Sequence, residues 1–357
     1  MRVVHVSPLY FSDESVIGGG ERYALELAKA MSAHVPTKLV TFGKTRRSMA
    51  DGALKIEIYP VWFYFGGKNV NPISLAFLPE LLDADVVHLH QYRIALSDIC
   101  VLAARALRKP IFASDHGGGG RNYAHRLGTD EHVTGFLLVS NYLAKQYSRH
   151  AHKIRIIYGG FNPGLFYPRQ VPRQRKAIFA GRLIPFKGIN YLVEGIDPGI
   201  ELHLIGRAYH PEYYDLLQRL ARGKRVTFQT ALSQEELATE YSSAMVDVLP
   251  SVYVDYYGTH HRKSEILGLV LLEAMACGAP VLVTRVGGMP ELVPEGEVGY
   301  IVPPNDPAAL GERIRYLHDN PGVVARMGQA AREHAMTHFT WDKVALNCLE
   351  AYEEMGR

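Results

Sequence analysis

The chain has 357 residues, enough for two domains of ordinary size that each bury a hydrophobic core. Hydrophobic residues make up 47% of it and charged residues 21%, which is usual for a soluble globular protein. The net charge of +3 is slight, and the Lys and Arg residues are dispersed, which argues against nucleic acid as a partner.

The sequence predicts a soluble, cytoplasmic protein. The first ten residues are too few and too polar for a signal peptide and predict a strand instead. The longest apolar tract, 267–283, is interrupted by Glu273, Gly278 and Pro280, so no transmembrane helix is expected. Three cysteines lie far apart without metal-ligand spacing and indicate buried free thiols: Cys100, Cys277 and Cys348.

The first half alternates short β-branched runs with segments of helical periodicity. We expect strands at 3–6, 38–42, 54–59, 85–90, 110–114, 135–140 and 153–158. We expect helices after the glycine run 18–20 and at 73–82, 91–107 and 140–150. This alternation predicts a parallel sheet with helices on both faces.

A proline-rich, basic segment at 161–176 predicts a linker, after which the pattern starts again. Strands are expected at 177–182, 200–206, 225–229, 245–251, 280–284 and 299–302. Helices are expected at 189–196, 211–222 and 233–243, and again toward the C-terminus. Two such α/β halves predict a cleft at the carboxyl ends of both sheets.

The segment 264–279, "SEILGLVLLEAMACGA", holds two glutamates around a glycine turn. We expect a short helix from Val270 to Cys277, ending at Gly278, with Glu265 before it and Glu273 in its second turn. The eight-residue step between the glutamates spans at most about 12 Å as helix, roughly the distance between the two sugars that a diphosphate joins. Free amides at the helix start favour an anion between them, so the segment suits a nucleotide sugar. The alternative is one exposed charge and one helix cap.

Two further motifs follow strands and carry phosphate chemistry. Arg182 and Lys187, in "FAGRLIPFKG", flank a turn and suit a diphosphate leaving group, or form an ordinary solvated pair. Gly19 and Gly20 open a helix and offer unhindered amides for a phosphate, or make a flexible turn. Their spacing does not match the dinucleotide-binding fingerprint, which disfavours a dehydrogenase.

Histidines mark the remaining candidates. His116, in "SDHGGGGR", follows a strand and could hold a substrate hydroxyl or a developing charge, although a lone loop histidine is more often inert. His88 and His90 lie on one face of a strand, but the sequence shows no third ligand, so no metal site is expected.

These motifs, in this order, resemble the family-4 retaining glycosyltransferases, which have the GT-B fold. The most specific part is 247–310, with "DVLPSV", "SEILGLVLLEAMACGAPVLVTRVGGMPELV" and "GEVGYIVPPNDPAAL". The resemblance covers nearly the whole chain, from "GGGERYALELAKAM" to "HFTWDKVALNCLEAYEEM". It implies an α/β fold of GT-B architecture, with two Rossmann-like domains whose parallel sheets face a central cleft. It also implies an acceptor-side domain at 1–165, a donor domain at 166–337 and a helix at 338–357 that crosses back to the first domain.

The resemblance also implies roles for particular residues. Arg182 and Lys187 would bind the donor diphosphate, Glu273 the ribose hydroxyls and Glu265 the transferred sugar, while His116 would face the reacting sugar. The remaining donor contacts would come from backbone amides and from apolar positions, with the base near Ala231 and Leu232: Gly19, Gly20, Ala231, Leu232, Leu267, Gly268, Leu269 and Val270.

The sequence departs from the family pattern in three places. Leu267 stands where the family usually has Phe before the glycine of the glutamate turn. An additional segment rich in Tyr and His occupies 253–263, either reshaping the donor-sugar pocket or forming a surface loop. The glycine run 117–120 after His116 is unusual for the family, so the resemblance does not specify the acceptor side of the cleft.

We therefore expect metal-independent transfer of a sugar from a nucleoside-diphosphate sugar to an acceptor hydroxyl, with retention and without a cofactor. The alternatives are a nucleotide-sugar epimerase or a phosphorylase on the same fold, or a non-catalytic sugar-nucleotide binding protein. The aromatic segment 59–82 suggests a lipid-linked acceptor or a peripheral membrane contact, with core packing under a loop as the alternative.

Overall fold

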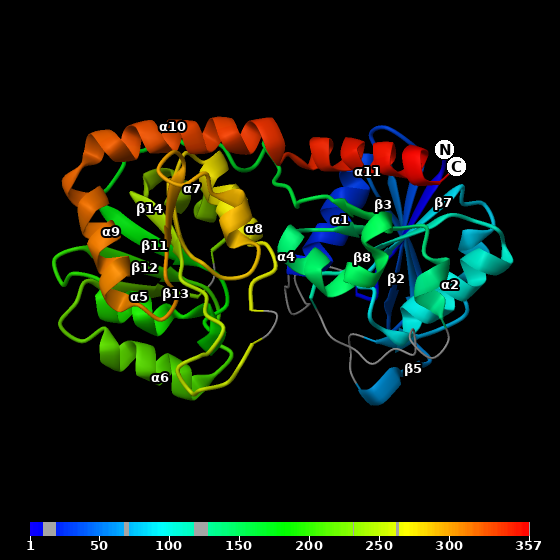
Figure 1. Ribbon diagram of the computed structural model, residues 1–357, viewed down its shortest axis with the longest axis horizontal. Helices are drawn as coiled ribbons and strands as arrows, with labels where there is room; N and C mark the ends of the chain where they lie inside the picture. The colour runs from blue at the N-terminus through cyan, green and yellow to red at the C-terminus, as the bar shows by residue number, and fades with distance from the viewer. Residues whose placement is uncertain (10–18, 68–70, 118–127, 231, 262–263, 357) are drawn as a thin grey trace. The chain divides into compact units, whose positions relative to one another are not determined.

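The computed structural model describes residues 1–9, 19–67, 71–117, 128–230, 232–261 and 264–356. The chain forms two compact units (Figure 1). The first consists of Met1–Gly160 together with Trp341–Arg357, and the second of Phe161–Thr340.

The first unit is built on an eight-stranded sheet of order β10-β9-β8-β7-β1-β2-β4-β3. All neighbouring strands are parallel except β3 and β4. The strands are β1 (Val3–Val6), β2 (Thr37–Gly43), β3 (Arg47–Asp51), β4 (Leu54–Pro60), β7 (Val86–His90), β8 (Ile111–Ser114), β9 (Gly135–Leu138) and β10 (Ile154–Ile156). A separate hairpin pairs β5 (Phe63–Tyr64) with β6 (Pro72–Ile73).

Helices cover both faces of this sheet. They are α1 (Gly19–Met31), α2 (Ala95–Ala106), the short α4 (Asn141–Ala144) and α11 (Trp341–Met355). The crossovers through α1 and α2 run in opposite directions along the sheet, and right-handed connections therefore place them on opposite faces. The C-terminal α11 lies beside α1, where Trp341 packs edge-on against Tyr23 with ring centroids 5.1 Å apart (Figure 1).

This unit differs from the expectations in one missed strand and two expected helices. The edge strand β3 was not expected because its side chains are exposed and show no apolar run. No α-helix forms at 73–82, where only a 3-10 turn, Leu78–Leu81, is found, because Pro79 cannot sit inside a helix. The expected helix at 140–150 is α-helical only over α4 and continues as 3-10 turns, Lys145–Lys153, in which Tyr147 and His150 are buried.

The aromatic segment 59–82 divides into two parts. Trp62 and Phe63 are 56% and 54% exposed, whereas Phe77 and Leu81 are fully buried. Packing into the core therefore accounts for the aromatic and aliphatic residues at the end of the segment, but not for the exposed Trp62 and Phe63 at its start.

The second unit contains a six-stranded parallel sheet of order β13-β12-β11-β14-β15-β16. The strands are β11 (Lys176–Ala180), β12 (Glu201–Ile205), β13 (Val226–Gln229), β14 (Val246–Leu249), β15 (Val281–Thr284) and β16 (Gly299–Val302). The helices are α5 (Ile189–Gly195), α6 (Pro211–Leu220), α7 (Gln234–Ser243), α8 (Leu269–Ala276), α9 (Pro307–Asp319) and α10 (Pro321–His338). The expected strands match these in order and position, because each is a short apolar run between turn residues.

Each sheet has one point at which the chain reverses its direction of travel along the strand order. In the first unit this point lies between β1 and β7, and in the second between β11 and β14. Loops at the carboxyl ends diverge there and leave room for a ligand. Functional residues are therefore expected at these two positions.

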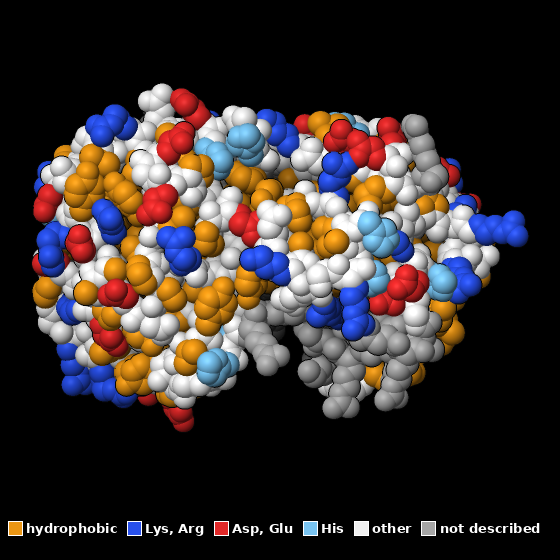
Figure 2. Space-filling view, in the orientation of Figure 1, with side chains coloured by type: hydrophobic (Ala, Val, Ile, Leu, Met, Phe, Trp, Pro, Cys, Tyr) orange, Lys and Arg blue, Asp and Glu red, His pale blue; other side chains and the backbone are white. Residues whose placement is uncertain are grey.

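Among the described residues no helix is long and apolar enough to cross a bilayer. On the face of each unit that Figure 2 shows, Lys and Arg side chains lie scattered among Asp and Glu, and the described residues form no continuous basic stripe there.

Candidate functional site

The glutamate segment lies at the switch point of the second unit, directly after β14. Helix α8 begins at Leu269, one residue earlier than expected, and Gly268 precedes it with a φ of +97°. The expected end is confirmed, since Gly278 has a φ of +81° and its amide donates to the carbonyl of Met275 at 2.9 Å. Glu265 thus lies in the loop before the helix, and Glu273 is buried within the helix.

Glu265 is held by two side chains from other loops. Lys187, at the end of the 3-10 turn after β11, forms an ion pair with its carboxylate, and both side chains are nearly buried, at 12% and 13% exposure. Ser251, just after β14, donates a hydrogen bond to the same carboxylate oxygen at 3.2 Å. Sequence reasoning placed Lys187 on a phosphate and Glu265 on a sugar, and gave no indication that they touch.

The loops after β11 and β14 are locked together at the backbone. The amide of Val252 donates to the carbonyl of Phe186 at 2.9 Å. Gly188 has a φ of +65°, and a Cβ there would lie 2.1 Å from the carbonyl oxygen of Pro250. Only glycine allows this approach, which brings Lys187 to Glu265.

A second glycine contact supports Glu265 from behind. Gly287 has a φ of +61°, and a Cβ there would lie 1.5 Å from the carbonyl oxygen of Glu265. The same carbonyl accepts a hydrogen bond from the amide of Gly288 at 3.1 Å. The amide of Gly287 in turn donates to the hydroxyl of Tyr253 at 2.8 Å. The backbone at Glu265 is therefore fixed by a turn about twenty residues away in sequence.

Arg182 differs from Lys187 in its surroundings. It lies in the loop after β11, its side chain is exposed, and it makes no ion pair within the described part of the chain. Lys187 is already neutralised by Glu265, so Arg182 supplies uncompensated positive charge here. The first amides of α8, at Leu269 and Val270, have no partner one turn earlier in the helix and add a partial positive charge.

A buried acid that sequence reasoning missed lies beneath this site. Asp247 on β14 is 1% exposed, and both of its carboxyl oxygens lack a hydrogen-bond partner within the described residues. Burial, and then the nearby negative charge of Glu273, hold the pKa of Asp247 well above its ordinary value, despite the opposing charge of Lys187. Asp247 therefore keeps its proton to a higher pH than an exposed carboxyl does. A polar residue in the middle of an apolar strand was the signal available in the sequence.

The described part of the additional segment, 253–261, is ordered around Asp255. This carboxylate accepts hydrogen bonds from His261 at 2.7 Å and from the amides of Tyr257 and Thr259. Burial acts to raise the pKa of Asp255, but these hydrogen bonds outweigh it and hold the pKa below its usual range. The segment also carries Tyr253, so it contributes to the support of Glu265.

The remaining positions of the expected donor site lie at the same edge of the sheet or outside the described residues. Leu267 is buried just before the glycine turn. Leu232 is half-buried in the loop between β13 and α7, and Ala231 lies outside the described residues.

In the first unit, the structure brings two expected site residues together. Gly20, in the first turn of α1, lies against His116, which follows β8, and a Cβ on Gly20 would be 2.9 Å from the Cβ of His116. Gly19 starts the same helix. Residues 118–120 of the glycine run lie outside the described residues.

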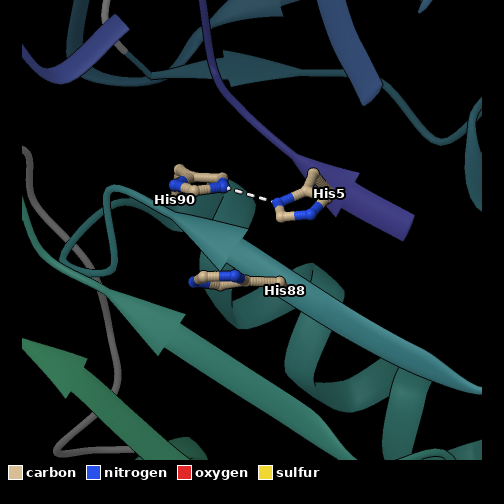
Figure 3. Close-up of side chains that lie close together, drawn as sticks. All are labelled: His5, His88 and His90. Atoms are coloured by element: carbon tan, nitrogen blue, oxygen red, sulfur yellow. Dashed lines mark hydrogen bonds between the residues drawn. The ribbon is translucent and has the colours of Figure 1, made fainter. Parts of the chain in front are cut away.

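The sequence showed no third histidine beside His88 and His90, but the structure places one there. His5 on β1 pairs in register with His88 on β7, and the three side chains lie together in the core (Figure 3). They were missed because His5 and His90 are 85 positions apart, and only the pairing of β1 with β7 joins them.

The arrangement of the three rings fits hydrogen bonding better than a shared metal ion. His88 and His90 are stacked, with centroids 4.4 Å apart and planes at 27°, and His5 is stacked on His90 at 16°. Lone pairs of stacked imidazoles lie in nearly parallel planes and do not converge on one point, as metal ligands must. Instead, a ring nitrogen of His5 and one of His90 are 2.9 Å apart, at hydrogen-bond distance.

Two family models match the chain in succession. The Glycosyltransferase Family 4 model matches residues 17–165, and the Glycosyl transferases group 1 model matches residues 168–334. Curated relatives include the D-inositol 3-phosphate glycosyltransferase of Streptomyces bingchenggensis, 27% identical over 100% of this chain and 89% of that protein. The enzyme of the same name from Streptomyces avermitilis is 27% identical over 99% of this chain and 86% of its own length.

Solved structures with the same fold cover both units. HepE of Anabaena, in complex with UDP, has a TM-score of 0.78 at 17% identity, over 99% of this chain and all of that one. Sucrose-phosphate synthase of Thermosynechococcus elongatus has a TM-score of 0.75 at 24% identity, over 100% of this chain and 99% of that one. The two family models cover nearly the whole chain, and these structures have the GT-B fold. The protein is therefore a glycosyltransferase, and it belongs to the family-4 (group 1) glycosyltransferases.

Proposed function

We propose that this glycosyltransferase moves a sugar from a nucleoside-diphosphate sugar to an acceptor hydroxyl, with retention of configuration and without a metal ion or cofactor. The observation that carries the proposal is the charge arrangement at the switch point of the second unit. An exposed Arg182, the ion pair of Lys187 with Glu265 and the free amides of α8 lie on adjoining loops. The complexes of HepE with UDP and with UDP-glucose support a donor of this class.

The diphosphate is proposed to bind Arg182 and Lys187, with the amides of Gly268, Leu269 and Val270 completing its surroundings. Negative charge that builds on the departing diphosphate is stabilised by donors already in place, and such stabilisation usually contributes more to catalysis than any other single effect. A diphosphate arriving at Lys187 competes with Glu265 for its ammonium group, so donor binding rearranges this ion pair.

The two glutamates are proposed to hold opposite ends of the donor. Glu265, freed in part from Lys187, accepts hydrogen bonds from hydroxyls of the transferred sugar, while Glu273 accepts them from the ribose. Leu267 closes the turn with an apolar side chain, and the base binds near Ala231 and Leu232. In the first unit, Gly19 and Gly20 are proposed to contact the donor phosphates, and His116 the reacting sugar.

The role of Arg182 is tested by Arg182→Ala. Loss of one preorganised donor at a developing charge costs about 2.7–4 kcal/mol of barrier, so kcat should fall roughly 10²- to 10³-fold. Arg225→Ala is the matched control, because Arg225 is also exposed but precedes β13, at the opposite edge of the same sheet. Equal turnover of the two variants would refute the assignment.

The donor class and the metal independence are tested by thermal unfolding of the full chain. UDP, GDP, ADP and their common sugar conjugates are each added, with and without EDTA. A ligand at about 100 times its dissociation constant adds about 2.7 kcal/mol of stability. Stabilisation by one nucleoside diphosphate that is indifferent to EDTA is the expected result. Stabilisation that EDTA abolishes would contradict metal independence, and stabilisation by none of them would contradict the donor class.

For the acceptor, we propose a hydroxyl on a lipid-linked molecule or a glycan. The exposed aromatic side chains of Trp62 and Phe63 support a peripheral contact with a membrane, since such residues favour the lipid–water interface. Flotation with anionic vesicles tests this part: the chain should float with them, and Trp62→Ser with Phe63→Ser should not. A wild-type chain that stays wholly in solution would refute it.

A further inference from the structure

A chain of hydrogen-bonded side chains runs through the core of the first unit and ends at His116. Nε2 of His5 lies 3.2 Å from the sulfur of Met31, and Nδ1 of His5 lies 2.9 Å from Nε2 of His90. Nδ1 of His90 lies 3.3 Å from Nε2 of His116. The chain thus crosses from the last residue of α1, through β1 and β7, to the loop after β8.

The methionine gives this chain a direction. A thioether sulfur carries no hydrogen and can only accept, so the proton of His5 must lie on Nε2. Nδ1 of His5 then accepts from Nε2–H of His90, whose own Nδ1 is left as an acceptor. That nitrogen accepts from Nε2–H of His116. The last member, Nδ1 of His116, is left with a free lone pair, and within the described part of the chain it has no hydrogen-bond partner.

His88 lies alongside and is fixed independently in the same tautomer. The hydroxyl of Ser114 donates to the carbonyl of Leu137 at 2.9 Å and therefore accepts from Nε2–H of His88 at 2.8 Å. Nδ1 of His88 accepts from the hydroxyl of Tyr352, on α11, at 2.6 Å. Both ring nitrogens of His88 are thus occupied, so His88 cannot change which nitrogens donate and which accept in the hydrogen bonds of His5, His90 and His116.

All four imidazoles are neutral at physiological pH. Burial lowers the pKa of His5 to about 3 and that of His116 to about 4. Burial, with the adjacent histidines, holds the pKa values of His88 and His90 well below the ordinary range. With no extra proton on any ring, the order of donors and acceptors set at Met31 extends to His116.

We propose that Met31, His5 and His90 are positioning residues that hold His116 as its neutral Nε2–H tautomer, so that Nδ1 accepts a hydrogen bond from a sugar hydroxyl. This deepens the proposed function and rests on it for the placement of His116 at the sugar. His116 then selects a hydroxyl that donates a hydrogen bond, and it does not act as a cation toward the leaving phosphate. Helix α1 contacts both ends of this hydrogen-bonded chain, since Met31 is its last residue and Gly20, in its first turn, packs on His116.

The tautomers are read by long-range ¹H–¹⁵N NMR of the full chain labelled with ¹⁵N-histidine, without substrate. Spectra of single-histidine variants assign the signals. In the wild type, His116 should give the pattern of a neutral Nε2–H ring. Met31→Leu keeps the volume but removes the acceptor, so a second tautomer of His116 should appear. Met327→Leu, a buried methionine on α10 in the other unit, is the matched control and should leave the His116 signals unchanged.

Turnover supplies the second readout. If only the Nε2–H form is productive, kcat of Met31→Leu should fall with the fraction of that form, and an equal mixture would about halve it. His90→Phe breaks the chain one step closer to His116 and should have at least as large an effect on both readouts.

Two NMR results would overturn the inference regardless of the reaction catalysed: an Nδ1–H ring at His116 in the wild type, or an unchanged tautomer in both Met31→Leu and His90→Phe. A different result tests the proposed function. Should the tautomers behave as expected while His116→Ala keeps full kcat, the contact of His116 with the sugar would be refuted, and the hydrogen-bonded chain would stand as a feature of the fold.

Discussion

Replacing Gly287 by alanine perturbs Glu265 without touching any charged group. The added Cβ would lie 1.5 Å from the carbonyl oxygen of Glu265, whereas real Cβ contacts essentially never fall below 3.0 Å. The two segments must therefore separate by about 1.5 Å at this point, the difference between the two distances. The hydrogen bond from Gly288 to the same carbonyl would lengthen as well.

The size of the effect follows from that displacement. A 1 Å misplacement of a positioned group costs about 10²-fold in rate, so kcat of Gly287→Ala should fall by about two orders of magnitude, or roughly 2.7 kcal/mol. Gly287→Ala should also lower the stability of the fold, since a residue other than glycine costs about 1–2 kcal/mol at any position with positive φ. Gly296→Ala isolates that backbone cost, because Gly296 has a φ of +80° and no atom near its Cβ position.

The assay compares kcat of the two variants with the nucleotide sugar identified by thermal unfolding, alongside their Tm values. Both variants should lose a few degrees of Tm, but only Gly287→Ala should lose turnover. Equal kcat values for the two variants would refute the argument that this turn fixes Glu265.

Two further predictions concern pH. Burial raises the pKa of Asp247 above its unfolded value, so the folded state retains a proton that the unfolded state releases, and the stability of the wild type should decline as pH rises above about 4. Asp247→Asn should remove this decline. A difference in unfolding free energy between the wild type and Asp247→Asn that does not widen between pH 5 and pH 8 would contradict this prediction. Hydrogen bonding from His203, and then from Lys176, outweighs partial burial and lowers the pKa of Glu240 to about 2, while Glu240 raises that of His203. The stability from Glu240 is complete above its unfolded pKa near 4 and is lost as pH falls toward 2, whereas that from His203 is lost as pH rises through its raised pKa. Glu240→Gln should therefore lower the free energy of unfolding most between pH 5 and 6, by about 1–2 kcal/mol after allowance for solvent screening. Urea unfolding measures this loss, and an equal loss at pH 8 would contradict the prediction.

Local sequence was sufficient to predict those elements whose limits are set by residues within or next to the element itself. The apolar runs bounded by turn residues predicted the positions along the chain of the parallel strands in both sheets. The end of α8 at Gly278 was predicted because glycine adopts the left-handed conformation that stops a helix. Where an interior proline was given too little weight, as with Pro79, the prediction failed.

Contacts between distant segments were decided only by the tertiary structure. Lys187 meets Glu265 across 78 positions, and His5 meets His90 across 85, because each pair is joined by strands that are neighbours in space and not in sequence. The raised pKa of Asp247 likewise depends on what surrounds it, since burial and the charge of Glu273 both disfavour the ionised carboxylate. Sequence by itself determined the family, the elements and the types of residue at the site. The pairing of strands and the exclusion of water determined which of those residues touch and which of them carry charge.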